Sequence, residues 1–233
     1  MPTTIQPQSA AVIKNLRENF NKYIKFIADR TYLLPFPSKA KINYGDDVAN
    51  RTFSNLLFKT DYVVTLQSLN ERSRIIHGLT HACRVAVYVV VLHNFQKIVI
   101  HSAAENSFPV KAMRFFTEKF GIAEDTILIL TKIAAFFHDS ARESDATEDY
   151  WDARSAENYY DFLVNIGVTE QLARFFANSI KYKDAQQLSC NIIEKYYREL
   201  FENLSEEEVA YCHYIRNLIN AADTVDVMRC AIY

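Results

Sequence analysis

Two adjacent residues that can bind a metal ion, His138 and Asp139, follow an almost entirely apolar segment at residues 127–137. Such a segment predicts a central helix that is buried on all sides. Ionisable side chains at the end of a buried helix need partners, because an unpaired buried charge is very costly. We therefore look for the partners of His138 and Asp139 elsewhere in the chain.

Two further predicted helices supply side chains that are suitable as partners. His77 and His81 are four residues apart, so on a helix they share one face. Asp223 lies near the middle of the last predicted helix. Two neutral imidazoles together with carboxylate oxygens suit a mid-sized divalent cation, with water in the remaining positions. A site of this kind can activate water for attack on phosphorus.

The other histidines carry a weaker signal. His93 and His101 stand alone in the sequence, and a lone histidine is more often a surface residue or a satisfied polar residue than a ligand. We assign no role to either residue. His213 is expected to be structural, although it lies two turns before Asn220 on the same helical face.

The elements that must position these residues are predicted to be helices. The chain is expected to form one all-α domain over residues 1–233, with a flexible lead at 1–9 and a helical and loop extension at 10–60. The segment at 73–95 is rich in valine, but its length favours a buried helix over a strand. The segment at 54–67 could be either a short helix or a strand. Eight or nine helices are expected, including those near residues 10–28, 73–95, 108–120, 124–140, 150–164, 170–180, 192–201 and 205–233.

Composition excludes several classes of function. The net charge is −2 without a large block of like charges, so nucleic acid is not expected as a partner. Only four glycines occur, which argues against a glycine-rich phosphate loop. The apolar stretch at 85–92 is too short to span a bilayer, and no signal peptide is visible at the N-terminus. The four cysteines form no CxxC pair, which favours free thiols in a reducing compartment and leaves one bridge open.

The order of the candidate ligands resembles a known pattern. His81, His138, Asp139 and Asp223 are similar to the H…HD…D set of the HD superfamily, an all-α fold of metal-dependent phosphohydrolases. A more specific resemblance, over about residues 73–233, is to the phosphodiesterase domain of SidE-type bacterial effectors. It is carried by IHGLTHACRV (76–85), FFHDSARESD (136–145), DYWDARSA (149–156) and AADTVDVMR (221–229).

The resemblance implies an HD-domain-like helical bundle and a reaction at phosphorus. SidE-type domains act on ADP-ribosylated ubiquitin, cleaving the pyrophosphate and transferring phosphoribosyl ubiquitin to serine, and related members remove that modification. The resemblance also implies that His77 is the nucleophilic or basic histidine, that Glu143 orients its imidazole, and that no metal is needed. Arg142, and more weakly Arg229, would bind the substrate phosphates. The protein would then be a secreted bacterial effector that acts in the host cytoplasm, and otherwise a cytoplasmic protein.

One position departs from the SidE pattern. The family has a second catalytic histidine immediately before the acidic segment near Asp223, and we expect Asn220 to hold that place. Asparagine can bind a phosphate, but it cannot deliver a proton at neutral pH. Activity is then expected to be weak unless His213 substitutes. No mono-ADP-ribosyltransferase partner domain is recognisable, so the chain would act on, or bind, a modification made elsewhere.

Three functions stay open at this point. The first is a SidE-like phosphodiesterase that acts on ADP-ribosylated or phosphoribosylated ubiquitin without a metal cofactor. The second is a metal-dependent HD nucleotide phosphohydrolase with one divalent ion, of the Mg, Mn, Fe or Ni type, at His81, His138, Asp139 and Asp223. The third is a catalytically silent module that binds ubiquitin or a nucleotide.

Overall fold

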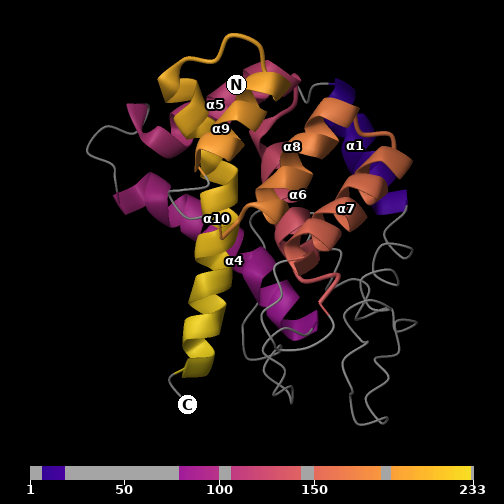
Figure 1. Ribbon diagram of the computed structural model, residues 1–233, viewed down its shortest axis with the longest axis vertical. Helices are drawn as coiled ribbons and strands as arrows, with labels where there is room; N and C mark the ends of the chain where they lie inside the picture. Colours follow the sequence, from indigo (N-terminus) through magenta and orange to yellow (C-terminus); the bar gives the residue numbers. More distant parts are fainter. Residues whose placement is uncertain (1–6, 19–78, 100–105, 143–149, 185–189, 232–233) are drawn as a thin grey trace.

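The computed structural model describes residues 7–18, 79–99, 106–142, 150–184 and 190–231, and within these ranges it contains eight α-helices and no strand (Figure 1). The prediction of an all-α fold is confirmed. His77, Glu143 and the ambiguous segment at 54–67 lie outside these ranges. The helices are α1 (Pro7–Glu18), α4 (Leu79–Val99), α5 (Phe108–Phe120), α6 (Glu124–Phe137), α7 (Tyr150–Asn165), α8 (Glu170–Lys181), α9 (Cys190–Leu200) and α10 (Glu206–Ala231).

Helix α6 is the centre of the bundle. Every residue from Thr126 to Phe137 is buried, and α6 packs against α1, α4, α5, α7, α8 and α10. This confirms the prediction of a central buried helix. The helix ends at Phe137, and a tight turn follows in which Ser140 N–H donates to the Phe137 carbonyl at 2.8 Å. His138 and Asp139 therefore stand on a turn that is itself buried.

The valine-rich segment is helical because it is buried. Residues 81–87 of α4 are all buried, as are Val89 and Val90, and α4 packs against both α6 and α10. Packing on most sides removes the preference of valine for a strand, which depends on its surroundings. Figure 1 shows the long helix α10 crossing α4. Among the described helices, none is both long and apolar enough to cross a lipid bilayer.

The ends of several helices follow from local sequence signals. Ser205 N–H donates to the Glu208 carboxylate at 2.8 Å, and Glu208 N–H donates to Ser205 Oγ at 3.3 Å, which confirms the capping box before α10. Gly121 ends α5 with φ of 63°, and Gly167 follows α7 with φ of 83°. Both angles lie in the left-handed region, where glycine is favoured. Thr169 occupies the N-cap position of α8, as predicted, but its side chain makes no capping hydrogen bond.

His93 and two of the cysteines are buried inside the bundle. His93 is fully buried, with Nδ1 2.7 Å from the Tyr214 hydroxyl and Nε2 3.2 Å from Glu124 Oε1. It is a satisfied structural residue that joins α4, α6 and α10. Cys83 and Cys212 are buried free thiols.

Phe175 stands at the centre of an aromatic cluster that joins α5 and α8 to Phe201. Its ring centroid lies 5.0 Å from that of Phe116, 5.5 Å from that of Phe120 and 5.8 Å from that of Phe201. Phe175→Ala should lower the free energy of unfolding by about 3–5 kcal/mol, because it opens a cavity in the core. Phe95→Ala is the matched control, since the Phe95 residue is 57% exposed. Urea denaturation measures both effects, and equal losses would contradict this view of the core.

Glu124 should make stability depend on pH in the acid range. Its hydrogen bond with His93 lowers the pKa of Glu124 from 4.5 to about 2, with a smaller effect from Lys97 and against the effect of burial. The folded state thus binds this proton less tightly than the unfolded state. The stabilisation is complete above about pH 4.5 and is lost as the pH falls toward 2. In Glu124→Gln, the free energy of unfolding should fall less steeply across this window, by an amount reduced by solvent screening. Urea denaturation at several pH values measures the slope, and parallel wild-type and variant profiles would contradict the prediction.

Candidate active site

Four side chains converge on one point in the interior where α4, α10 and the turn after α6 meet. His81 Nε2 lies 3.2 Å from His138 Nε2 and 3.2 Å from Asp223 Oδ1. Asp139 Oδ2 lies 3.5 Å from His81 Nε2 and 3.3 Å from His138 Nε2. Both imidazoles are fully buried, whereas 14% of the Asp223 side chain is exposed. The structure thus brings together the four residues that the sequence grouped, and Asp223 lies on the most open side.

Each imidazole is fixed by a partner on its far nitrogen. His138 Nδ1 donates to the Ala135 carbonyl at 2.6 Å, and His81 Nδ1 donates to Asp226 Oδ2 at 2.7 Å. A carbonyl and a carboxylate can only accept, so both protons are assigned to Nδ1. In the neutral imidazoles, each Nε2 atom then presents a lone pair toward the other and toward the carboxylates. Four electron-pair donors therefore meet at one point.

The carboxylates are held on their outer sides by cations. Lys183 Nζ donates to Asp223 Oδ2 at 3.1 Å, and Arg142 Nη1 forms an ion pair with Asp139 Oδ1 at 3.6 Å. Arg84 binds both oxygens of Asp226, at 2.5 and 3.0 Å. Partners of this kind fix the orientation of metal-ligating side chains. Each of the four converging side chains therefore has its outer atom held and its inner atom directed to the common point.

The distances fit a divalent cation. A cation about 2.1 Å from each ligand atom separates neighbouring ligands by about 3.0 Å in octahedral geometry and about 3.4 Å in tetrahedral geometry. The separations among His81 Nε2, His138 Nε2 and Asp223 Oδ1 are 3.2, 3.2 and 3.5 Å, close to this range, so these three residues form the group that could hold an ion. While both imidazoles are neutral, with their protons on Nδ1, the buried Asp223 Oδ1 accepts no hydrogen bond from the described residues. An unsatisfied buried carboxylate oxygen is costly, and a cation would satisfy it.

The electrostatics of the site favour positive charge between the imidazoles. Burial would lower the pKa of His138, but the carboxylates of Asp139 and Asp223 raise it to about 9. Burial also opposes protonation of His81, yet hydrogen bonds to Asp223 and Asp226 raise its pKa. Burial would raise the pKa of Asp223, but His138, His81 and Lys183 together hold it far below its usual range. The centre therefore attracts protons or a metal cation.

The remaining predicted residues have different surroundings. The Arg142 side chain is 16% exposed, and its guanidinium lies 5.2 Å from the centroid of the Trp151 ring. Asn220 Nδ2 donates to the Lys183 carbonyl at 2.6 Å, and Asn220 Oδ1 accepts a hydrogen bond from Thr224. Arg229 is part of α10, but its side chain is not among the described atoms. The roles predicted for these residues stay predictions.

Asp226 and Lys183, which hold His81 and Asp223 in place, were not identified from the sequence. Asp226 lies three residues after Asp223, so helical spacing could have placed it on the same face of α10. Lys183 gave no such signal, because it reaches Asp223 only through the packing of the turn after α8 against α10. A charged residue in a turn is ordinarily expected to be solvated.

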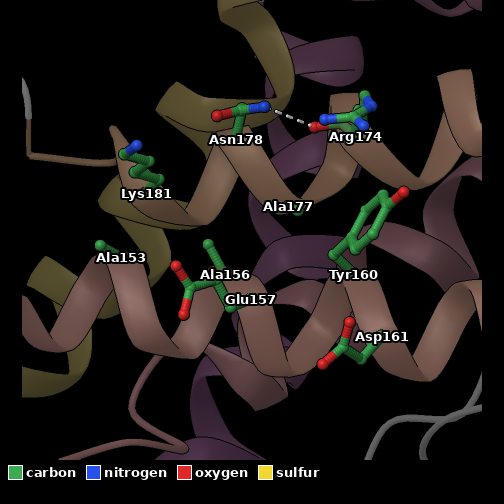
Figure 2. A pocket seen from close by; sticks show the side chains of 9 residues that line it. All are labelled: Ala153, Ala156, Glu157, Tyr160, Asp161, Arg174, Ala177, Asn178 and Lys181. Atoms are coloured by element: carbon green, nitrogen blue, oxygen red, sulfur yellow. Dashed lines mark hydrogen bonds between the residues drawn. The ribbon is translucent and has the colours of Figure 1, made fainter.

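A hollow of about 360 Å³ lies between α7 and α8 (Figure 2). Figure 2 shows small side chains such as Ala153 and Ala177 in the hollow and charged side chains such as Glu157 and Lys181 around it. Arg174, at one end, is already bound to Glu170 and stacks on the Tyr160 ring. None of the four converging residues lines this hollow, so it is separate from the candidate active site.

Comparison with known proteins identifies the family. No curated protein and no solved structure matches the chain. A family model described as the SidE phosphodiesterase (PDE) domain matches residues 41–233, a range that contains all four converging residues. This match confirms the resemblance to SidE-type domains, whereas membership of the HD superfamily stays a prediction. Because this family model matches most of the sequence, the chain belongs to the SidE phosphodiesterase domain family.

Proposed function

We propose that this protein is a metal-dependent phosphodiesterase that hydrolyses a phosphodiester or pyrophosphate linked to ribose. The observation that carries the proposal is the convergence of His81, His138 and Asp223, whose ligand atoms lie 3.2–3.5 Å apart, with Asp139 Oδ2 3.5 and 3.3 Å from the two imidazoles. The family match supports the reaction class. The convergence of the residues that resemble the H…HD…D pattern supports the wider assignment to the HD superfamily. ADP-ribosylated and phosphoribosylated ubiquitin are the proposed substrates, since they are those of SidE-type domains.

The side chains of the chain have distinct roles in this proposal. The two Nε2 lone pairs and the inner oxygens of Asp139 and Asp223 hold the cation. When bound, a divalent cation would polarise a phosphoryl oxygen and promote attack by water. Arg142 is partly exposed beside Asp139, so its guanidinium can bind a phosphate oxygen of the substrate.

The second candidate function is the metal-free SidE-like reaction, which the family match favours. In this route His77 is the nucleophile or base, Glu143 orients it, and the four converging residues form a polar framework. A silent binding module is the third candidate. It is suggested by Asn220, which cannot act as a general acid and whose amide binds the Lys183 carbonyl.

Removal of divalent cations with EDTA distinguishes these three candidate functions. Wild-type protein should hydrolyse ADP-ribosylated ubiquitin, lose activity in EDTA and regain it with Mn²⁺. His138→Ala should lower kcat by more than about 100-fold. The reason is that the loss of a direct metal ligand lowers activity more than the loss of a residue that only orients a ligand. Intact-mass spectrometry of ubiquitin measures the turnover. Lys195→Ala, an exposed change on α9, is the control and should retain activity.

Other outcomes would select another function. Activity that survives EDTA and disappears in His77→Ala would favour the metal-free route. Absence of turnover with measurable binding of ADP-ribosylated ubiquitin would favour the binding module.

Asp226 should tune metal affinity through His81. Asp226→Asn removes the charge that holds the Nδ1 proton of His81, so Mn²⁺ affinity should fall by about 10–100-fold. Titration of Mn²⁺ followed by electron paramagnetic resonance measures the affinity. Asp161→Asn, an exposed change on α7, is the matched control. Unchanged Mn²⁺ affinity in a folded Asp226→Asn variant would contradict the proposed arrangement.

A further inference from the structure

We infer that Trp151 is a positioning residue that directs the guanidinium of Arg142 toward a phosphate group of the substrate. This inference rests on the proposed function in one respect, because it takes Arg142 as a side chain that binds phosphate. It requires no metal ion, so it applies to the metal-free route and to a binding module as well as to metal-dependent hydrolysis.

The guanidinium of Arg142 is held by an aromatic ring and by a carboxylate. Its Cζ atom lies over the Trp151 ring, 5.2 Å from the centroid, and its Nη1 atom forms an ion pair with Asp139 Oδ1 at 3.6 Å. A cation within about 6 Å of a tryptophan centroid is attracted to the ring, and the attraction is stronger when water is excluded. Trp151 is only 5% exposed, and the Arg142 side chain is 16% exposed. The contact is therefore largely shielded from water, while part of Arg142 can still reach a substrate.

The burial of Trp151 is not explained by its polar atom. A buried tryptophan usually donates its N–H to an acceptor. Within the described ranges, Trp151 Nε1 is buried and has no hydrogen-bond partner. The ring therefore contributes through its apolar surface and its face. A ring face attracts a guanidinium without accepting its N–H bonds, which leaves these donors to oxygen atoms such as Asp139 Oδ1.

Helix α7 also holds the turn that carries this guanidinium. Ser155 Oγ accepts a hydrogen bond from Ala141 N–H at 3.0 Å, and Asn158 Nδ2 donates to Ser140 Oγ at 3.2 Å. Trp151, Ser155 and Asn158 are spaced by four and three residues, so they lie on one face of α7. Three successive residues of the turn thus each contact one residue of this face. The hydrogen bonds fix the turn, and the indole ring fixes the direction of the guanidinium.

A purely structural role and a positioning role of Trp151 lead to different results. If Trp151 only fills space, its replacement weakens phosphate binding by the same factor whichever cation stands at position 142. If Trp151 directs a guanidinium, the loss depends on Arg142. Lysine keeps the positive charge, but it is a compact charge on a flexible stem and has no planar group for the ring to orient. The effect of removing the ring in the Arg142→Lys background therefore decides between the two roles.

The experiment titrates the whole chain with inorganic pyrophosphate in EDTA and measures the affinity by calorimetry. Trp151→Leu should lower the affinity by about 5–20-fold in the wild-type background and by less than about twofold in the Arg142→Lys background. Trp151→Phe should lie between wild-type protein and Trp151→Leu, because phenylalanine keeps a smaller aromatic face. Tyr160→Leu is the matched control. It removes a ring of the same helix that has Arg174 at the same distance of 5.2 Å, and it should bind pyrophosphate as wild-type protein does.

The single tryptophan of the chain gives a second and direct measurement. The tryptophan fluorescence comes from Trp151 alone, so pyrophosphate bound beside Arg142 should change the emission of wild-type protein. The change should persist in Tyr160→Leu and be absent from Arg142→Ala at the same pyrophosphate concentration. If Trp151→Leu folds poorly, Trp151→Phe takes its place in the titrations, with an expected loss of about threefold in the wild-type background.

The same series shows which idea fails. Equal losses of affinity in the wild-type and Arg142→Lys backgrounds, or an emission that pyrophosphate leaves unchanged, would overturn the role of Trp151. Wild-type protein that binds no pyrophosphate would also overturn it, because Arg142 would then bind no phosphate. Wild-type protein that binds pyrophosphate but does not hydrolyse ADP-ribosylated ubiquitin would overturn the proposed hydrolysis alone, and the titrations would still decide the role of Trp151.

Discussion

The structure depends on the meeting of two imidazoles and two carboxylates in the buried region between α4, α6 and α10. His81 and His138 place their Nε2 atoms 3.2 Å apart with Asp139 and Asp223 beside them. Such a cluster is unfavourable in a protein interior unless positive charge enters it. The surrounding contacts follow from this requirement, because each of the four residues is held from behind by a partner outside the centre.

These outer contacts also link the helices. Asp226 connects His81 and Arg84 on α4 to α10, and Lys183 connects the turn after α8 to Asp223 on α10. The polar site is therefore built into the packing of the bundle. The apolar surroundings strengthen every electrostatic contact within it, since a less polarisable interior screens charges weakly. The proposed binding of a phosphate and of a cation would both use this arrangement of charge.

The fold could be predicted to a large extent from local patterns. The apolar run at 127–137 predicted the buried helix α6, glycines predicted the ends of α5 and α7, and Ser205 with Glu208 predicted the start of α10. These signals act over a few residues, so they can be read without knowledge of the rest of the chain. The absence of a capping hydrogen bond from Thr169 shows the limit, because a side-chain rotamer depends on its neighbours.

The sequence by itself determined which residue types were available for chemistry and on which helices they lie, because spacing along a helix fixes a face. It thereby grouped His81, His138, Asp139 and Asp223. Only the tertiary structure decided how these residues are supported. The contact of Lys183 with Asp223 joins residues 40 positions apart, and that of Asp226 with Arg84 joins residues 142 positions apart. Such contacts arise from the packing of whole helices, and no pattern of a few residues contains them.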